Sequence, residues 1–159
     1  MDSMLDGSRF DVESGLGILH RPTLGEPFAV VYKPGGLPSA PLFDGDDSAL
    51  TRVASLFPEA SSVVGRKGVE KGLVHRIDTG TSGLVLVATD QSFFDYLQDA
   101  QSKGLFKKWY RAGVAFVCSC AEKLGGFPPC PAVPAVGSEF LAESSFRPFG
   151  PKGSQVRPV

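Results

Sequence analysis

Two short apolar runs constrain the fold of this chain more than any other feature. Phe28 to Lys33 (FAVVYK) is rich in β-branched and aromatic residues, and Gly83 to Ala88 (GLVLVA) is almost wholly apolar. Both runs have the length of a strand rather than of a helix. Pro34-Gly35-Gly36 must end the first run, because proline lacks a backbone N–H and glycine favours a turn. The sequence therefore predicts two strands, of which the second is buried.

Two other segments have the apolar spacing of helices. Ser48 can cap a short helix that ends at Pro58, and Asp90 can cap a second helix from Gln91 to Ser102, with Gly104 as its stop. The inward faces of these helices are expected to carry Leu50, Val53, Ala54, Phe57, Phe93, Phe94, Leu97 and Ala100.

A third strand is expected from Phe106 to Val117, where alternation places Lys108, Tyr110 and Ala112 on one face. Strands and helices alternate without the regular rhythm of a parallel sheet. We therefore predict an α+β domain with a mixed, mostly antiparallel sheet and flanking helices. Residues 1–27 are expected to form an N-terminal extension or edge element, and residues 28–159 the domain itself.

Length and charge limit the class of protein. A chain of 159 residues suffices for one domain with a real core. The formal net charge is −1, so no global positive field gathers nucleic acid, although residues 51–159 carry thirteen basic and nine acidic side chains. The N-terminus lacks the apolar stretch of a signal peptide, and no apolar run reaches the ~18 residues that span a bilayer. We expect a monomeric cytoplasmic protein without a membrane partner.

Three cysteines, Cys118, Cys120 and Cys130, cannot form a full set of disulfides. A zinc site would need a fourth ligand, and the nearest histidine is the distant His75. The cysteines are therefore interpreted as free thiols, and no metal is expected.

The segment from Gly72 to Leu84 carries the clearest chemical signal. A short apolar strand leads into His75-Arg76-Ile77-Asp78, and a turn rich in Gly, Thr and Ser follows before the next strand. Loops held between rigid strands often carry catalytic residues. Backbone N–H groups and an arginine beside Asp78 would keep its carboxylate ionised, as a nucleophile must be.

Simpler interpretations of these residues stay open at this point. Asp78 can accept a hydrogen bond that closes its own turn, and His75 can be a structural histidine. The run from Gly80 to Gly83 can form a phosphate-binding nest. That run lacks the Gly-Lys-Ser/Thr ending of a P-loop, however, and leads into a strand rather than a helix.

His75-Arg76-Ile77-Asp78 with Thr81-Ser82-Gly83 resembles the signature of the RluA-type pseudouridine synthases, His-Arg-Leu-Asp followed by Thr-Ser-Gly. Val30 to Leu37 resembles the Val-Tyr-Lys-Pro-x-Gly motif of this family, and Lys108 to Ala112 resembles its Lys-x-Tyr-x-Ala motif. The three motifs follow the family order. The resemblance implies a pseudouridine synthase catalytic-domain fold and the isomerisation of uridine in structured RNA, either rRNA or tRNA, with no metal and no cofactor.

The resemblance also implies roles for individual residues. Asp78 matches the catalytic aspartate, Tyr110 matches a tyrosine that packs against the base, and Arg76 matches an arginine that contacts RNA. Four basic residues near these motifs are further candidates for RNA contacts: Lys33, Lys107, Lys108 and Arg111. Three alternatives stay open: Tyr110 as a core tyrosine, the basic cluster as a solvated face, and Lys33 as a structural residue.

The family's third motif, Arg-Thr-His-Gln-Ile-Arg, has no clear counterpart in this sequence. Its last arginine is implied to pair with the catalytic aspartate. Gln155-Val156-Arg157 resembles the end of the motif, but no histidine precedes it. We therefore expect the chain to stop before this motif, which leaves Arg157 as one possible substitute. The alternative function is that of an impaired or inactive RNA-binding fragment of the same fold.

Overall fold

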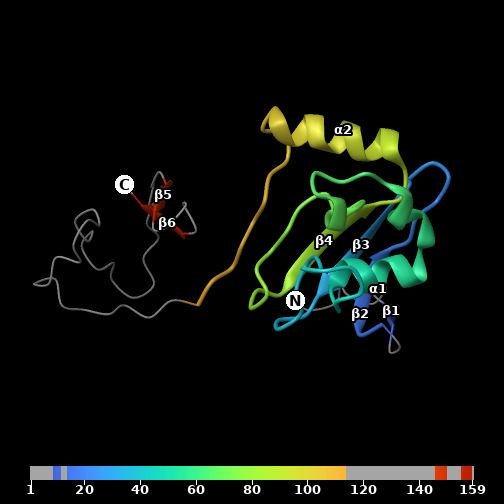
Figure 1. The fold of residues 1–159 in the computed structure, drawn as a ribbon, viewed down its shortest axis with the longest axis horizontal. Helices are drawn as coiled ribbons and strands as arrows, with labels where there is room; N and C mark the ends of the chain where they lie inside the picture. Colours follow the sequence, from blue (N-terminus) through green and yellow to red (C-terminus); the bar gives the residue numbers. More distant parts are fainter. Residues whose placement is uncertain (1–8, 12–13, 114–145, 150–154, 159) are drawn as a thin grey trace, which may run out of the picture. The chain divides into compact units, whose positions relative to one another are not determined.

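The computed structural model describes residues 9–11, 14–113, 146–149 and 155–158. The chain divides into two compact units, Met1–Lys108 and Trp109–Val159. The first unit contains a four-stranded antiparallel sheet in the order β1-β2-β3-β4 (Figure 1). Its strands are β1 (Arg9–Asp11), β2 (Leu16–His20), β3 (Phe28–Lys33) and β4 (Gly83–Ala88).

The two strands predicted most clearly, β3 and β4, are confirmed with the predicted bounds. They pair without interruption, from Phe28 opposite Ala88 to Lys33 opposite Gly83. One detail differs from the expectation of a fully buried β4, because Leu84 is exposed. Within residues 1–27, β1 lies at the edge of the sheet and β2 lies inside it.

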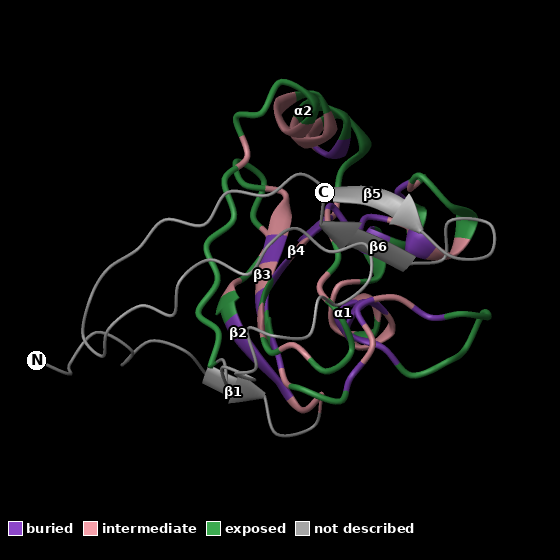
Figure 2. Cartoon of the chain, turned by 90° about the vertical axis from the view of Figure 1, so that its left-hand side faces the viewer, coloured by how far each residue is buried: buried purple, intermediate pink, exposed green. Residues whose placement is uncertain are grey.

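Alternating side chains give the sheet two faces. Figure 2 shows buried residues along β2, β3 and β4. On one face, Val31 and Val85 pack in the main core against helix α1 (Ala49–Leu56). On the other face, Phe28 stacks on Phe93 of helix α2 (Gln91–Ser102), with ring centroids 5.1 Å apart. The helices therefore cover opposite faces of the sheet, and the predicted α+β class with flanking helices is confirmed.

The helix starts follow the sequence signals. Ser48 caps α1 through its side chain, which accepts a hydrogen bond from the Thr51 N–H at 3.1 Å, and the Thr51 hydroxyl accepts one from the Ser48 N–H at 2.8 Å. This reciprocal arrangement is a capping box. Asp90 caps α2 by accepting a hydrogen bond from the Phe93 N–H at 2.9 Å. Two short 3₁₀-helices, η1 (Pro58–Ser62) and η2 (Gly68–Glu70), lie between the two α-helices in sequence.

The strand predicted from Phe106 to Val117 is wrong over its described part. Residues 106–113 form no strand, and residues 114–117 lie outside the described residues. In the second unit, β5 (Phe146–Phe149) pairs antiparallel with β6 (Gln155–Pro158). No helix within the described ranges is long and apolar enough to cross a membrane.

The chain before the His75–Asp78 motif is fixed to the edge of β4 that lies away from β3. Leu73 forms a bridge with Val87, and the Ala88 N–H donates a hydrogen bond to the Gly72 carbonyl at 2.8 Å. Gly72 permits this approach because it has no Cβ. A Cβ there would lie 2.0 Å from the Ala88 carbonyl oxygen. The motif therefore starts from a rigid edge.

We expect Gly72→Ala to lower the free energy of unfolding by about 1–3 kcal/mol, because the methyl group forces this edge away from β4. Urea unfolding followed by far-UV circular dichroism measures the change. Gly25→Ala is the matched control, since a Cβ at Gly25 meets nothing within 4 Å. Equal stability of the two variants would contradict the close packing at Gly72.

Candidate functional site

Asp78 lies on an exposed loop that follows the edge segment. The loop backbone is tied to residues 36–39 by three hydrogen bonds. The Ser39 hydroxyl donates to the Ile77 carbonyl at 2.6 Å and accepts from the Ile77 N–H at 3.1 Å. The Gly36 N–H donates to the Thr79 carbonyl at 2.8 Å. The backbone on both sides of Asp78 is thus held, while the side chain faces outward.

Two glycines make this contact between the loops possible. Gly36 has φ +89°, in the left-handed region that a side chain disfavours. Gly35 approaches Gly80 so closely that a Cβ on it would lie 3.2 Å from the Gly80 carbonyl oxygen. The predicted turn after β3 is therefore confirmed, and it has a second purpose: it allows the motif around Lys33 to pack against the motif around Asp78.

Lys33 is fully buried beneath these loops, at the end of β3. Its ammonium donates hydrogen bonds to the carbonyls of Leu37 at 2.6 Å, Pro34 at 3.0 Å and Thr79 at 3.2 Å. Burial lowers the pKa of Lys33, and the nearby charge of Asp78 acts in the opposite direction. An ammonium with no exposed surface does not reach a ligand, so the prediction that Lys33 contacts RNA disagrees with this structure. The structural alternative fits its position.

Arg76 is exposed, two residues before Asp78, but its charge partner is not Asp78. Its guanidinium donates a hydrogen bond to the buried Glu70 carboxylate at 3.0 Å. The arginine next to Asp78 in the sequence therefore pairs with a different carboxylate in this structure. The charge of Asp78 acts on Lys33, which lies far away in sequence.

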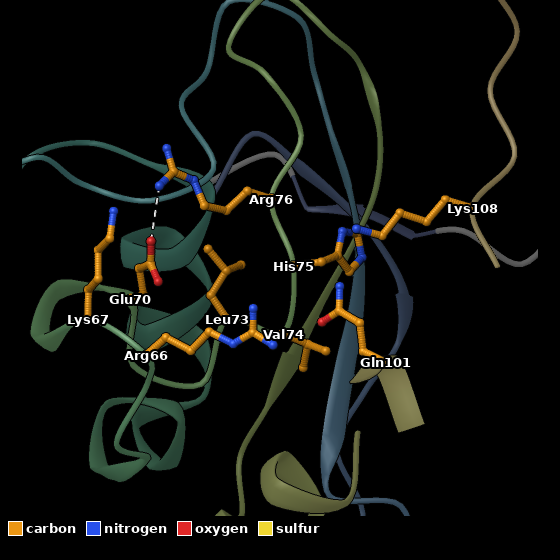
Figure 3. A pocket seen from close by; sticks show the side chains of 9 residues that line it. All are labelled: Arg66, Lys67, Glu70, Leu73, Val74, His75, Arg76, Gln101 and Lys108. Carbon is orange, nitrogen blue, oxygen red and sulfur yellow. Dashed lines mark hydrogen bonds and ion pairs between the residues drawn. The ribbon is translucent and has the colours of Figure 1, made fainter. Parts of the chain in front are cut away.

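His75 and Lys108 meet beside this loop, and Figure 3 shows both among the side chains around a pocket. His75 is largely buried, and its ring lies 5.6 Å from that of Phe106, centroid to centroid. Burial and the Lys108 ammonium both lower the pKa of His75, while the Arg76 backbone has a smaller, opposite effect. The imidazole is therefore neutral near pH 7. Lys107 is exposed and follows Phe106 in sequence.

Tyr110 and Arg111 belong to the second unit and are exposed there. Arg157 lies in β6 of the same unit, opposite Arg147. Cys118, Cys120 and Cys130 lie outside the described residues. Within the first unit, the structure thus brings Lys33 close to Asp78, and it places Arg76 and Lys108 around one pocket.

Sequence reasoning missed two residues of this site. Ser39 holds the Ile77 backbone from 38 positions away, and Glu70 pairs with Arg76 across six positions. Ser39 lies in a loop and Glu70 ends the short 3₁₀-helix η2, and no local sequence pattern distinguishes either residue. For Lys33, in contrast, a signal existed: alternation along β3 places it on the same face as the core residues Ala29 and Val31.

The fold is a small α+β domain. Its site presents the Asp78 carboxylate on a loop whose backbone is hydrogen-bonded to the buried Lys33. A family model described as RNA pseudouridylate synthase matches residues 27–136, and the chain belongs to this family. An uncharacterised RNA pseudouridine synthase of Mycoplasma pneumoniae is 33% identical over 91 residues. The match covers 57% of this chain and 27% of that protein, so this chain spans about a quarter of its relative.

Members of this family are isomerases that act on RNA. Among the residues that the structure describes, no group of three or more His, Cys, Asp or Glu side chains is placed to hold a metal ion.

Proposed function

We propose that this chain isomerises uridine to pseudouridine in structured RNA, with Asp78 as the catalytic carboxylate, in the manner of the RluA-type enzymes. The observation that carries the proposal is the exposed Asp78 on a loop whose backbone is held at Ile77 and Thr79. A catalytic group needs such fixed geometry, since small misplacements cost large factors in rate.

The reaction exchanges one bond for another. The bond between the ribose C1′ and N1 of the uracil breaks, the base turns, and a bond from C1′ to C5 forms. The hydrogen on C5 leaves to solvent, and N1 gains a proton, so the atoms balance without an oxidant or reductant. Asp78 acts as the nucleophile toward the target nucleotide, which must first leave its helical stack. The bond that its carboxylate forms to the nucleotide breaks again before the product leaves, so the carboxylate is regenerated.

The remaining residues are assigned to substrate binding. Tyr110 packs against the extruded base, and Arg76 contacts the RNA and fills the space that the base leaves. Lys107, Lys108 and Arg111 meet the RNA backbone. Lys33 is proposed as a positioning residue rather than as an RNA contact, because it is buried.

We further propose rRNA or tRNA as the substrate, and a monomer acting in the cytoplasm without a metal or cofactor. These details rest on the resemblance of the three sequence motifs to the family.

Release of tritium from RNA that contains 5-tritiated uridine tests the proposal, because the isomerisation expels the hydrogen on C5. We expect release from tRNA or rRNA of the same source with the full chain. Release that does not exceed that of a protein-free sample would reject catalysis by this chain. RNA binding without release would instead support the alternative of an inactive RNA-binding module.

A further inference from the structure

A pocket of ≈ 280 Å³ lies beside the Asp78 loop (Figure 3). Three parts of the first unit build it: the chain around η2, the segment after the sheet edge, and the end of α2 with the residues that follow. Its lining residues are Arg66, Lys67, Glu70, Leu73, Val74, His75, Arg76, Gln101 and Lys108.

The pocket has an excess of positive charge. Four cationic side chains line it against one acidic side chain, and that acid, Glu70, is already paired with Arg76. Within the described residues, the other cations, Arg66, Lys67 and Lys108, have no acidic partner. All three are exposed, so an anion can reach them from solvent.

Among the residues that the structure describes, two polar atoms in the wall of the pocket have no hydrogen-bond partner. These atoms are Nδ1 of His75 and Oε1 of Gln101, and both are buried. A buried polar atom without a hydrogen bond destabilises the fold, so such atoms need an explanation. A neutral imidazole offers one N–H donor. The Gln101 amide offers an NH₂ group at the same place once the amide is rotated by half a turn. Together with the cations, these groups suit a ligand that carries several acceptor oxygens.

We propose that this pocket binds a phosphate group of the RNA backbone, close to the nucleotide that Asp78 attacks. The inference rests on the proposed function for the choice of RNA. Arg76 links the two places, because it lines the pocket and lies two residues from Asp78. Arg66 and Lys67 become phosphate contacts, which the motifs of the sequence do not indicate.

Inorganic phosphate titrated into the full chain tests the pocket without any reaction. The chain has two histidines, so the C2–H proton resonances of His75 and His20 are easily distinguished. We expect saturable movement of the His75 resonance, with His20 on β2 unmoved as an internal reference. Arg66→Gln should weaken the binding at least about fivefold. An unmoved His75 resonance, or equal binding by Arg66→Gln, would overturn the proposed anion pocket.

A labelled RNA hairpin tests the source of the phosphate. We expect Arg66→Gln and Lys67→Gln each to reduce the slope of log affinity against log salt by about 0.7–0.9, as for one lost phosphate contact. Arg21→Gln is the control, because Arg21 is exposed over Phe57, outside the pocket. Salt slopes of the pocket variants equal to that of Arg21→Gln would overturn the assignment to RNA, even if inorganic phosphate binds.

These outcomes separate from those of the proposed function. If the chain binds phosphate and RNA through Arg66 but releases no tritium, the phosphate pocket is supported and the isomerase function is rejected. If the variants of Arg66 and Lys67 release tritium as fast as the unchanged chain and have the same salt slope, the isomerase function is supported and the phosphate pocket is rejected.

Discussion

Asp78→Asn should abolish tritium release, with a fall of at least about 1000-fold in turnover. The substitution keeps the shape of the side chain but removes the negative charge that makes it a nucleophile. Folding should be almost unaffected, since within the described part of the chain the Asp78 carboxylate accepts no hydrogen bond and is exposed to solvent. Single-turnover tritium release with purified protein in excess over RNA gives the rate.

Asp44→Asn is the matched control for this variant. Asp44 is also an exposed loop aspartate, and within the described residues it has no ion pair. It should release tritium at the rate of the unchanged chain. If Asp78→Asn retained a tenth or more of the rate, the carboxylate would not be the nucleophile. If neither protein turned over and both bound RNA equally, the chain would be a binding module.

Much of the fold could be predicted because its signals are local. The bounds of β3 follow from β-branched residues that end at Pro34, and the start of α1 follows from Ser48, a residue type that favours the N-cap. These patterns need no knowledge of distant residues. Asp78 and Arg76 could be selected on the same basis, because they lie in one short and distinctive motif.

The other features of the fold and site depend on contacts between residues far apart in the sequence, which no local pattern predicts. Alternation from Phe106 onward places side chains on two faces, but a strand also needs a neighbour for its backbone hydrogen bonds, and residues 106–113 form no strand. Glu70 pairs with the guanidinium of Arg76 because the 3₁₀-helix η2 places the Glu70 carboxylate next to it. Ser39 and Lys33 hold the Asp78 loop from a separate segment, and this contact exists only after folding.

Lys33→Met should destabilise the fold by about 3–5 kcal/mol. The substitution leaves buried carbonyl groups without the hydrogen bonds that the Lys33 ammonium donates to them in the unchanged chain. The carbonyls of Pro34 and Leu37 lose the ammonium, and the Thr79 carbonyl retains the Gly36 N–H. Methionine has a similar length and no polar head, so little packing volume changes. Urea unfolding followed by far-UV circular dichroism measures the loss against the unchanged chain.

The same variant separates a positioning role from a purely structural one. Lys33 donates a hydrogen bond to the Thr79 carbonyl, next to Asp78, and lies close enough for the charge of Asp78 to act on the ammonium. The turnover rate of Lys33→Met should therefore fall about tenfold or more in conditions where the variant is still folded. Lys103→Met makes the same change at an exposed lysine paired with Asp99, and it should cost less than about 1 kcal/mol. A Lys33→Met protein as stable and as active as this control would show that the buried ammonium neither supports the loop nor positions Asp78.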